Sequence, residues 1–429
     1  MSRISFSSRA SGRPKPSKWG ETVLSRKDFL KAMGLGVLAS PAFGRAAAVT
    51  ASARGGALTQ AAPYKGVKIT GVDIYLMDLA LKQPFTIAIG TITAANDVLI
   101  YVHTDAGITG LGEACPALPI TGETQAQSAA VARDVRQLVV GREATAIESL
   151  LHSFGPFVHS APSVVAAYDM ALYDIVGKIA GLPVFRLLGG DRTTFETDRT
   201  VSLDTPEAMA AKAQGFVARG FRTIKVKVGQ DPDTDVARVE AVRAAIGAGP
   251  GIRIDANQGW TVPQAISTLR RLEKFRIQFA EQPVVASDIA GLKAVDDQSP
   301  IPIMADEAVF QPEDALKLVK AEACRYINIK LMKAGGIARS VRIAHIADSA
   351  NIRCMVGCMN ESRVALTAAA HCVASQSNIV FSDLDGNEEH TSDPVVGGFD
   401  IKDGMIVLSE KPGLGVDVDP AFVKTLKKV

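Results

Sequence analysis

Short apolar runs alternate with longer amphipathic segments through the second half of the chain, from about residue 195 to residue 385. Eight runs of five to eight residues are rich in β-branched side chains, which is typical of buried strands. They occupy residues 197–203, 221–228, 251–256, 277–281, 301–305, 326–330, 352–358 and 378–384. Helical periodicity fills the intervals, for example at 206–220 and 336–350. This alternation predicts an α/β fold, a (β/α)7β modified TIM barrel over residues 193–386.

An open, doubly wound sheet would show a similar alternation of strands and helices. Such a sheet places a glycine-rich phosphate-binding turn after its first strand and gathers its polar residues at one switch point. Here no such turn follows the first strand, and polar residues follow many of the strands. The pattern therefore favours the barrel.

The region before the barrel has a different pattern. Residues 66–116 contain three β-segments with a loop at 84–93, and residues 123–190 show helical periodicity. We therefore expect an α+β capping domain over residues 63–192. After the barrel, residues 387–429 are polar and short-stranded, and we expect them to return to this capping domain.

Residues 1–62 are set apart by composition. Residues 25–31, SRKDFLK, resemble a twin-arginine export motif with Lys27 at the place of the second arginine. An apolar run at 32–43 and three alanines at 46–48 follow, and the run is too short for a stable membrane span. The pattern predicts an export leader and a periplasmic mature protein. A disordered tail on a cytoplasmic protein is the alternative.

Charge and cysteine content exclude several classes of protein. The net charge is +2 from 47 basic and 45 acidic residues, and aromatic residues make up 6% of the chain, which argues against a nucleic-acid partner. The five cysteines form no CxxC pair, so a structural zinc site or a disulfide framework is not indicated. We expect the cysteines to be small buried apolar side chains.

Charged residues close five of the predicted strands at nearly equal steps. From Lys227 to Asp255 is 28 residues, and the steps to Glu281, Asp306 and Lys330 are 26, 25 and 24 residues. Each step is about one strand–helix unit, so these side chains should meet at the carboxyl-terminal rim of the barrel.

Asp255, Glu281 and Asp306 are the candidate metal ligands. A single strand-end carboxylate is most often a turn former or an ion-pair partner, but three converging carboxylates repel one another unless a cation lies among them. A ligand set made only of oxygens indicates a hard ion, so we expect one Mg²⁺ per subunit, with Mn²⁺ as a substitute.

Lys227 and Lys330 are the candidate acid/base residues. They lie on opposite sides of the ring, and Lys225 shares the inward face of its strand with Lys227. Burial, a cation and a neighbouring lysine all lower the pKa of an amine, which would suit it to proton abstraction beside a carboxylate. Two opposed amines favour racemisation or epimerisation over elimination. Anion binding by the lysines is the alternative.

The segments TIKVKVG, DANQGW, AEQPV, ADEAV and INIKLMKAGGI resemble the enolase superfamily, muconate-lactonising subgroup, and the resemblance covers residues 66–410. It implies the same lysine and metal-ligand roles. It also implies that Asn257 and Glu307 support the ligands and that Thr200 contributes to the substrate pocket.

The eighth predicted strand ends in Asp383 and Asp385, two alternate aspartates that would suit a substrate ammonium group; a turn is the alternative. With Glu361 after the seventh strand, this DxD pattern resembles the dipeptide epimerases, where such aspartates bind the first residue's ammonium group. We therefore expect a small-molecule dipeptide as substrate and a homo-oligomer as the assembly.

The loop at 84–91 departs from one branch of that group. In Ala-Glu epimerases an arginine in this loop pairs with the glutamate side chain, whereas here the matching place is Gly90 and no Arg or Lys lies between residues 84 and 104. We expect a small or apolar second residue in the dipeptide.

Three other functions compete with this interpretation. An N-acylamino acid racemase, an o-succinylbenzoate synthase or a cycloisomerase would share the core, but its substrate would lack a free ammonium group. An acid-sugar dehydratase would need a histidine base, and His371 falls in the helix after the seventh strand. A non-catalytic binding protein would have lost a lysine or an acid, and each of these residues is present.

Overall fold

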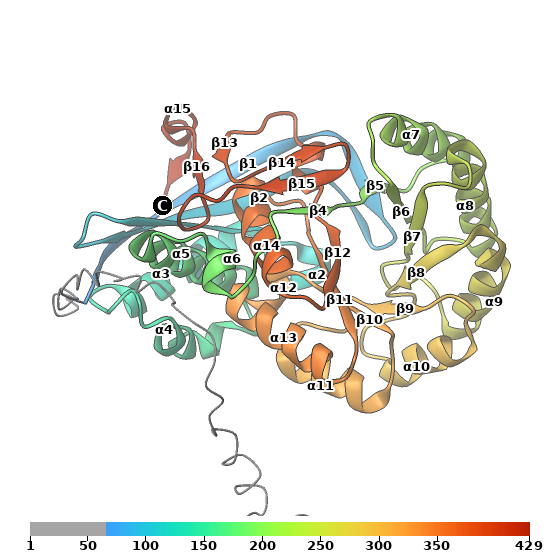
Figure 1. The fold of residues 1–429 in the computed structure, drawn as a ribbon, viewed down its shortest axis with the longest axis horizontal. Coiled ribbons are helices and arrows are strands. Elements are labelled where there is room, and N and C mark those ends of the chain that lie inside the picture. Colours follow the sequence, from blue (N-terminus) through green and yellow to red (C-terminus); the bar gives the residue numbers. More distant parts are fainter. Residues whose placement is uncertain (1–65) are drawn as a thin grey trace, which may run out of the picture. The chain divides into compact units, whose positions relative to one another are not determined.

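The computed structural model describes residues 66–429, so the predicted export leader lies outside the described residues. Within 66–429, no helix combines the length and the apolar character needed to cross a lipid bilayer. The described residues form one compact unit, in which an eight-stranded parallel sheet adjoins a four-stranded antiparallel sheet (Figure 1).

The parallel sheet is a nearly closed barrel whose strands follow chain order. Its strands are β5 (Arg199–Val201), β6 (Thr223–Lys227), β7 (Gly251–Asp255), β8 (Ile277–Glu281), β9 (Ile303–Ala305), β10 (Tyr326–Ile329), β11 (Arg353–Gly357) and β12 (Ile379–Asp383). Its connecting helices are α7 (Pro206–Ala218), α8 (Pro232–Ile246), α9 (Val262–Leu272), α10 (Ile289–Gln298), α11 (Pro312–Ala321), α12 (Leu331–Ala334), α13 (Ile337–Ser349) and α14 (Arg363–Ser375). The Asp198 N–H donates to the Ser382 carbonyl at 3.3 Å and joins the last strand to the first. The predicted barrel is confirmed.

Local sequence signals set where each barrel helix begins. Thr205 caps α7 and Asp231 caps α8, and each is followed by a proline at the first helical position. A side-chain oxygen at the cap satisfies a free backbone N–H, and proline has no N–H to leave free. The strands therefore end in short polar turns, which place their last residues at one rim.

The barrel interior below this rim is filled. Strand alternation puts Arg253, Phe279 and Met304 two residues below Asp255, Glu281 and Asp306, on the same inward face. Phe279 and Met304 pack with Met355 in a core cluster, and Arg253 lies over the Phe279 ring at 5.3 Å. The three acids therefore lie directly above a layer of packed side chains, at the open end of the barrel.

The capping region has a sheet in the order β17-β1-β2-β3. Its elements are β1 (Ile69–Ile87), β2 (Gly90–Thr104), β3 (Thr109–Ala114), α2 (Leu118–Thr121), α3 (Gln125–Val139), α4 (Ile147–Ser153), α5 (Pro162–Ala180), α6 (Val184–Leu187) and the end strand β17 (Lys427–Lys428). The strands after the barrel form three short pairs: β14 (Phe399–Lys402) with β15 (Met405–Leu408), β13 (Val395–Gly397) with β16 (Val416–Val418), and β15 with β4 (Thr194–Glu196), which precedes the barrel. A 3-10 turn (Gly386–Glu389) and the helix α15 (Pro420–Val423) complete the C-terminal segment.

The chain end returns to the first strand, because Tyr75 pairs with Lys428 and Leu76 with Lys427. The prediction of a loop at 84–93 is wrong, because this segment is the end of a β-hairpin in which β1 and β2 pair up to Ile87 and Gly90. Alternating Thr and Ile side chains suit this pairing, and a register break after Ala80 bends the hairpin. The hairpin reaches the barrel, where the Leu203 N–H donates to the Thr86 carbonyl at 3.0 Å.

Candidate active site

Three buried carboxylates meet at the barrel rim. Asp255 and Glu281 end β7 and β8, Asp306 follows β9, and one oxygen from each lies within 4.8 Å of the other two. All three residues are fully buried. Glu281 Oε2 and Asp306 Oδ2 face the ammonium groups of Lys225 and Lys330, at 2.9 and 3.0 Å. Three carboxylates with oxygens at this separation fit a hard divalent cation.

Two residues that the sequence patterns did not single out hold these acids in place. Asn328, on β10, donates from Nδ2 to Glu281 Oε1 at 2.8 Å. The buried Lys333 ammonium contacts both Oδ1 and the backbone carbonyl of Asp306. Lys333 lies three residues after Lys330 in KLMK, and that spacing was its only signal in the sequence.

Lys225 lies among the acids. Its Nζ is 3.0 Å from Asp255 Oδ2, 2.9 Å from Glu281 Oε2 and 2.7 Å from Asp383 Oδ2. Strand alternation predicted that this lysine points into the barrel. In the structure it contacts both the candidate metal ligands and the first aspartate of the DxD pair.

Lys227 and Lys330 approach the carboxylates from different strands. Lys227 Nζ lies 2.6 Å from Asp255 Oδ2 and 3.0 Å from Asn257 Oδ1, whereas Lys330 Nζ lies 3.0 Å from Asp306 Oδ2. Lys227 ends β6, and Lys330 directly follows β10, four strands further along the eight-stranded order. Strands four positions apart stand on opposite sides of an eight-stranded ring, so the two amines face each other across the site.

The carboxylates dominate the electrostatics of the site. Burial lowers the pKa of Lys225 and of Lys330, but the surrounding carboxylates together outweigh it, with Asp255 contributing most for Lys225 and Asp306 for Lys330. Both lysine pKa values therefore lie above their usual range. This is opposite to the direction expected from burial and neighbouring lysines. Burial and the Asp255 charge raise the pKa of Glu281 to about 8.

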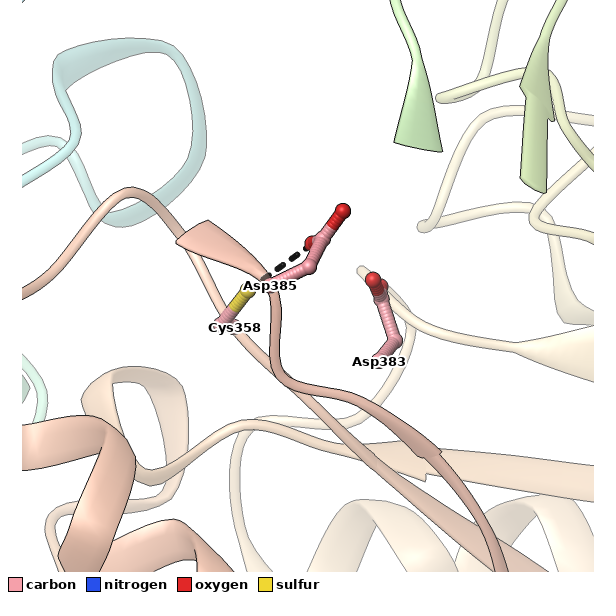
Figure 2. A group of neighbouring side chains, drawn as sticks. All are labelled: Cys358, Asp383 and Asp385. Atoms are coloured by element: carbon pink, nitrogen blue, oxygen red, sulfur yellow. Dashed lines mark hydrogen bonds between the residues drawn. The ribbon is translucent and has the colours of Figure 1, made fainter. Parts of the chain in front are cut away.

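The DxD pair is anchored on one side. Asp385 Oδ2 accepts from Arg199 Nη1 and from the Thr200 N–H, both at 2.7 Å, and Thr200 Oγ1 donates to Asp383 Oδ1 at 3.4 Å. Arg199 was not predicted from the sequence, because its side chain is visible as a partner only once β5 and β12 are adjacent. Figure 2 shows Cys358 beside the pair, with Sγ 4.0 Å from Asp385 Oδ1.

The remaining predicted residues divide into two groups. Asn257 donates to Glu307 Oε1 at 3.0 Å and accepts from Lys227, so both lie beside the lysine and the acids. Glu361 is buried, accepts the Met359 N–H at 2.6 Å and is not part of the cavity lining. Burial, with the nearby Glu113 charge, raises the pKa of Glu361 to about 7.

A cavity of about 450 Å³ opens above the acids, between the barrel rim and the capping region. Its barrel side includes Lys225, Lys227, Asn257, Lys330, Cys358, Asp383 and Asp385. Its capping side includes Phe85, Ile87, Gly90, Ile92, Leu118, Pro119 and Ile120. The barrel wall thus carries several charges, whereas the capping wall combines these apolar side chains with the polar Asn96, Glu123, Thr124 and Gln125.

His371 lies away from this cavity. It is fully buried in α14, accepts the Phe185 N–H at Nδ1 and contacts the Leu414 carbonyl through Nε2, each at 3.1 Å. A histidine base for dehydration is therefore not supplied from this position. The five cysteines are buried free thiols, as expected.

Two family models match the chain: the mandelate racemase/muconate lactonizing enzyme N-terminal domain over residues 69–189, and the enolase C-terminal domain-like family over residues 208–422. The chain belongs to the enolase superfamily. The predicted resemblance is thereby confirmed.

Several relatives within the superfamily are epimerases. The L-Ala-D/L-Glu epimerase of Clostridium acetobutylicum is 40% identical over 81% of this chain and 98% of its own length. The hydrophobic dipeptide epimerase of Enterococcus faecalis is 41% identical over 82% of this chain and 99% of its own. The dipeptide epimerase of Cytophaga hutchinsonii, solved with Mg and D-Ala-L-Val, matches with a TM-score of 0.83 and 36% identity, over 84% and 99% of the two chains.

Proposed function

We propose that this protein is a dipeptide epimerase that inverts the α-carbon of the second residue and prefers a small or apolar side chain there. The predicted class, an isomerase acting on dipeptides, is confirmed by the epimerase relatives. The observation that carries the mechanism is the placement of Lys227 and Lys330 on opposite sides of one carboxylate cluster.

Asp255, Glu281 and Asp306 would hold one Mg²⁺ in each subunit, with Mn²⁺ as a substitute, and the relative solved with Mg supports this choice. When bound, the cation supplies a Lewis acid that neutralises charge developing on a substrate carboxylate.

The two lysines perform the proton transfers. One, as a neutral amine, removes the α-proton, and the other, as an ammonium, donates a proton to the opposite face of the same carbon. The reverse reaction exchanges their roles. Asn257 orients Lys227 through its Oδ1, and Glu307 fixes the Asn257 amide in turn.

Asp383 and Asp385 bind the ammonium group of the first residue, with Thr200 holding both aspartates through its backbone and hydroxyl. A free ammonium group distinguishes dipeptides from the N-acylated substrates of the competing racemase. Glu361 acts indirectly, because it holds the Met359 backbone and does not reach the cavity.

The capping side of the cavity determines the second residue. Phe85, Ile87, Ile92 and Ile120 present apolar surface, and Gly90 stands where a charge-pairing side chain would be needed. Among the described residues of the hairpin tip, none is basic. An aliphatic or aromatic side chain therefore finds a matching environment.

Deuterium exchange tests the two-lysine assignment. In D₂O, the wild type should exchange the α-proton of the second residue in both L,L- and L,D-dipeptides and should interconvert them. Lys227→Ala and Lys330→Ala should each lose epimerisation by more than about 1000-fold, yet retain exchange with one diastereomer only, a different one for each variant. The readout is mass spectrometry of deuterium uptake.

A Lys293→Ala variant serves as the matched control and should behave as the wild type, because Lys293 is a half-buried lysine of α10 that pairs with Asp297 outside the cavity. Exchange of both diastereomers by either site variant would contradict the assignment. Faster exchange of N-acetyl dipeptides than of free dipeptides would instead favour the N-acylamino acid racemase.

We also propose that the protein is exported through its twin-arginine-like leader and that it assembles as a homo-oligomer. Sequencing the mature amino terminus after cell fractionation tests export, because an uncleaved terminus in the cytoplasmic fraction would contradict it. Sedimentation equilibrium tests the assembly.

A further inference from the structure

The thiol of Cys358 stands beside the DxD pair, and its chemistry is not used in the proposed mechanism. Cys358 Sγ and one oxygen each of Asp383 and Asp385 lie within 4.8 Å of one another. Figure 2 shows the three side chains converging from two neighbouring strands. All three are buried, and all three line the cavity.

The strand register fixes this arrangement. Gly357, at the end of β11, pairs with Asp383, at the end of β12, so Cys358 lies level with Leu384, between the two aspartates along the chain. Gly386 closes the turn, where a Cβ would come within 3.4 Å of the sulfur. The thiol therefore lies against the backbone of the turn that follows β12.

In each aspartate, Oδ2 is held by a cationic side chain, and Asp383 Oδ1 also accepts the long hydrogen bond from Thr200 Oγ1. Asp383 Oδ2 pairs with the Lys225 ammonium group, and Asp385 Oδ2 accepts hydrogen bonds from Arg199 and from the Thr200 N–H. The remaining Oδ1 of Asp385 faces the sulfur at 4.0 Å.

An ammonium group has three N–H donors in tetrahedral directions. With donor–acceptor distances of about 2.9 Å, its three acceptors lie about 4.7 Å apart. The two carboxylates and the thiol lie within 4.8 Å of one another, so one ammonium group can reach all three. Two aspartates alone would leave one N–H of a buried ammonium without a partner, and such a loss is costly.

We propose that Cys358 is the third acceptor for the substrate ammonium group and contributes to the selection of free dipeptides. This inference rests on the proposed function. Burial, together with the nearby Asp383, Glu361 and Asp385 charges, raises the pKa of the thiol well above its usual value. The sulfur therefore contacts the ammonium as a neutral, weak acceptor and adds no third negative charge.

Kinetics with a matched pair of substrates tests the inference. L-Ala-L-Leu carries the ammonium group, and propionyl-L-Leu has the same shape without it. Cys358→Ala should raise KM for L-Ala-L-Leu about fivefold, with kcat within about twofold, because one hydrogen bond to a charged group is lost. KM for propionyl-L-Leu should stay unchanged, and Cys358→Ser should recover part of the loss.

Cys354→Ala is the control, because Cys354 is a buried thiol near the other end of the same strand. An equal loss on both compounds, or no loss on either, would overturn the inference while leaving the proposed function intact. If the wild type epimerises neither compound, nor any other free dipeptide, the proposed function fails and the inference fails with it.

Discussion

We expect a single residue on the hairpin tip, Gly90, to decide whether the cavity tolerates a charged second residue in the dipeptide. Gly90 lines the cavity, and a Cβ built there meets Pro119 Cγ at 3.6 Å, an ordinary van der Waals contact. Gly90→Arg should therefore fit and supply the missing cation. We expect kcat/KM for L-Ala-L-Glu relative to L-Ala-L-Leu to rise about tenfold, the value of one charge-assisted hydrogen bond.

Gly90→Gln separates charge from bulk in this experiment, since glutamine adds a flexible polar side chain without a charge. It should reduce turnover of both dipeptides without changing their ratio. A wild-type enzyme that already prefers L-Ala-L-Glu would show that some other group supplies the positive charge.

At the scale of elements, α14 is joined to the capping region by buried polar contacts. Glu113, on β3, accepts hydrogen bonds from the Ser362 N–H and hydroxyl and from the Ala365 N–H, at 2.7 to 2.9 Å. These donors belong to the first turn of α14, where backbone N–H groups lack partners within the helix. His371, two turns further on, makes the contacts to Phe185 and Leu414.

The buried His371 contacts predict how the free energy of unfolding depends on pH. Burial lowers the pKa of His371 to about 4 from 6.5, so the unfolded chain binds more protons between these values. Stability should be complete above pH 6.5 and fall on acidification, by about 2 kcal/mol at pH 5. Urea unfolding at pH 7 and pH 5 measures this difference. His371→Gln should be less stable than the wild type at pH 7, but its free energy of unfolding should fall less between pH 7 and pH 5.

The exposed His159 offers the comparison, because His159→Gln should retain the full loss. An equal slope for the wild type and His371→Gln would show that other groups cause the acid sensitivity.

Sequence patterns located most of the elements, and the reasons for the failures are local. The step of about 25 residues from Asp255 to Lys330 indicated the barrel, because each acid or amine had to end a strand. The hairpin tip was predicted as a loop because the pairing of β1 and β2 continues further along the chain than the sequence pattern indicated. Arg199 and Asn328 were missed because their partners are distant in sequence and become neighbours only in the closed sheet.

At the scale of the whole molecule, metal binding should be linked to folding. Lys225 contacts Asp255 and Glu281 within 3.0 Å, and Lys333 contacts Asp306, so these amines neutralise the acids without a cation. The protein should therefore fold in EDTA. A ligand that binds only the native state raises the free energy of unfolding by RT ln(1 + [L]/Kd), about 2.7 kcal/mol at 100 times Kd. Urea titrations with Mg²⁺ or EDTA measure this increment.

The ligand assignment decides which variants retain that increment. Asp255→Asn and Asp306→Asn each replace a carboxylate of the cluster with a neutral amide, a weaker donor for a hard cation, so the Mg²⁺ increment should largely disappear. Asp385→Asn changes a buried carboxylate at the same rim that is held by Arg199, and it should keep the increment. Equal increments in Asp255→Asn and the wild type would place the cation elsewhere, and the opposed lysines would then need another explanation.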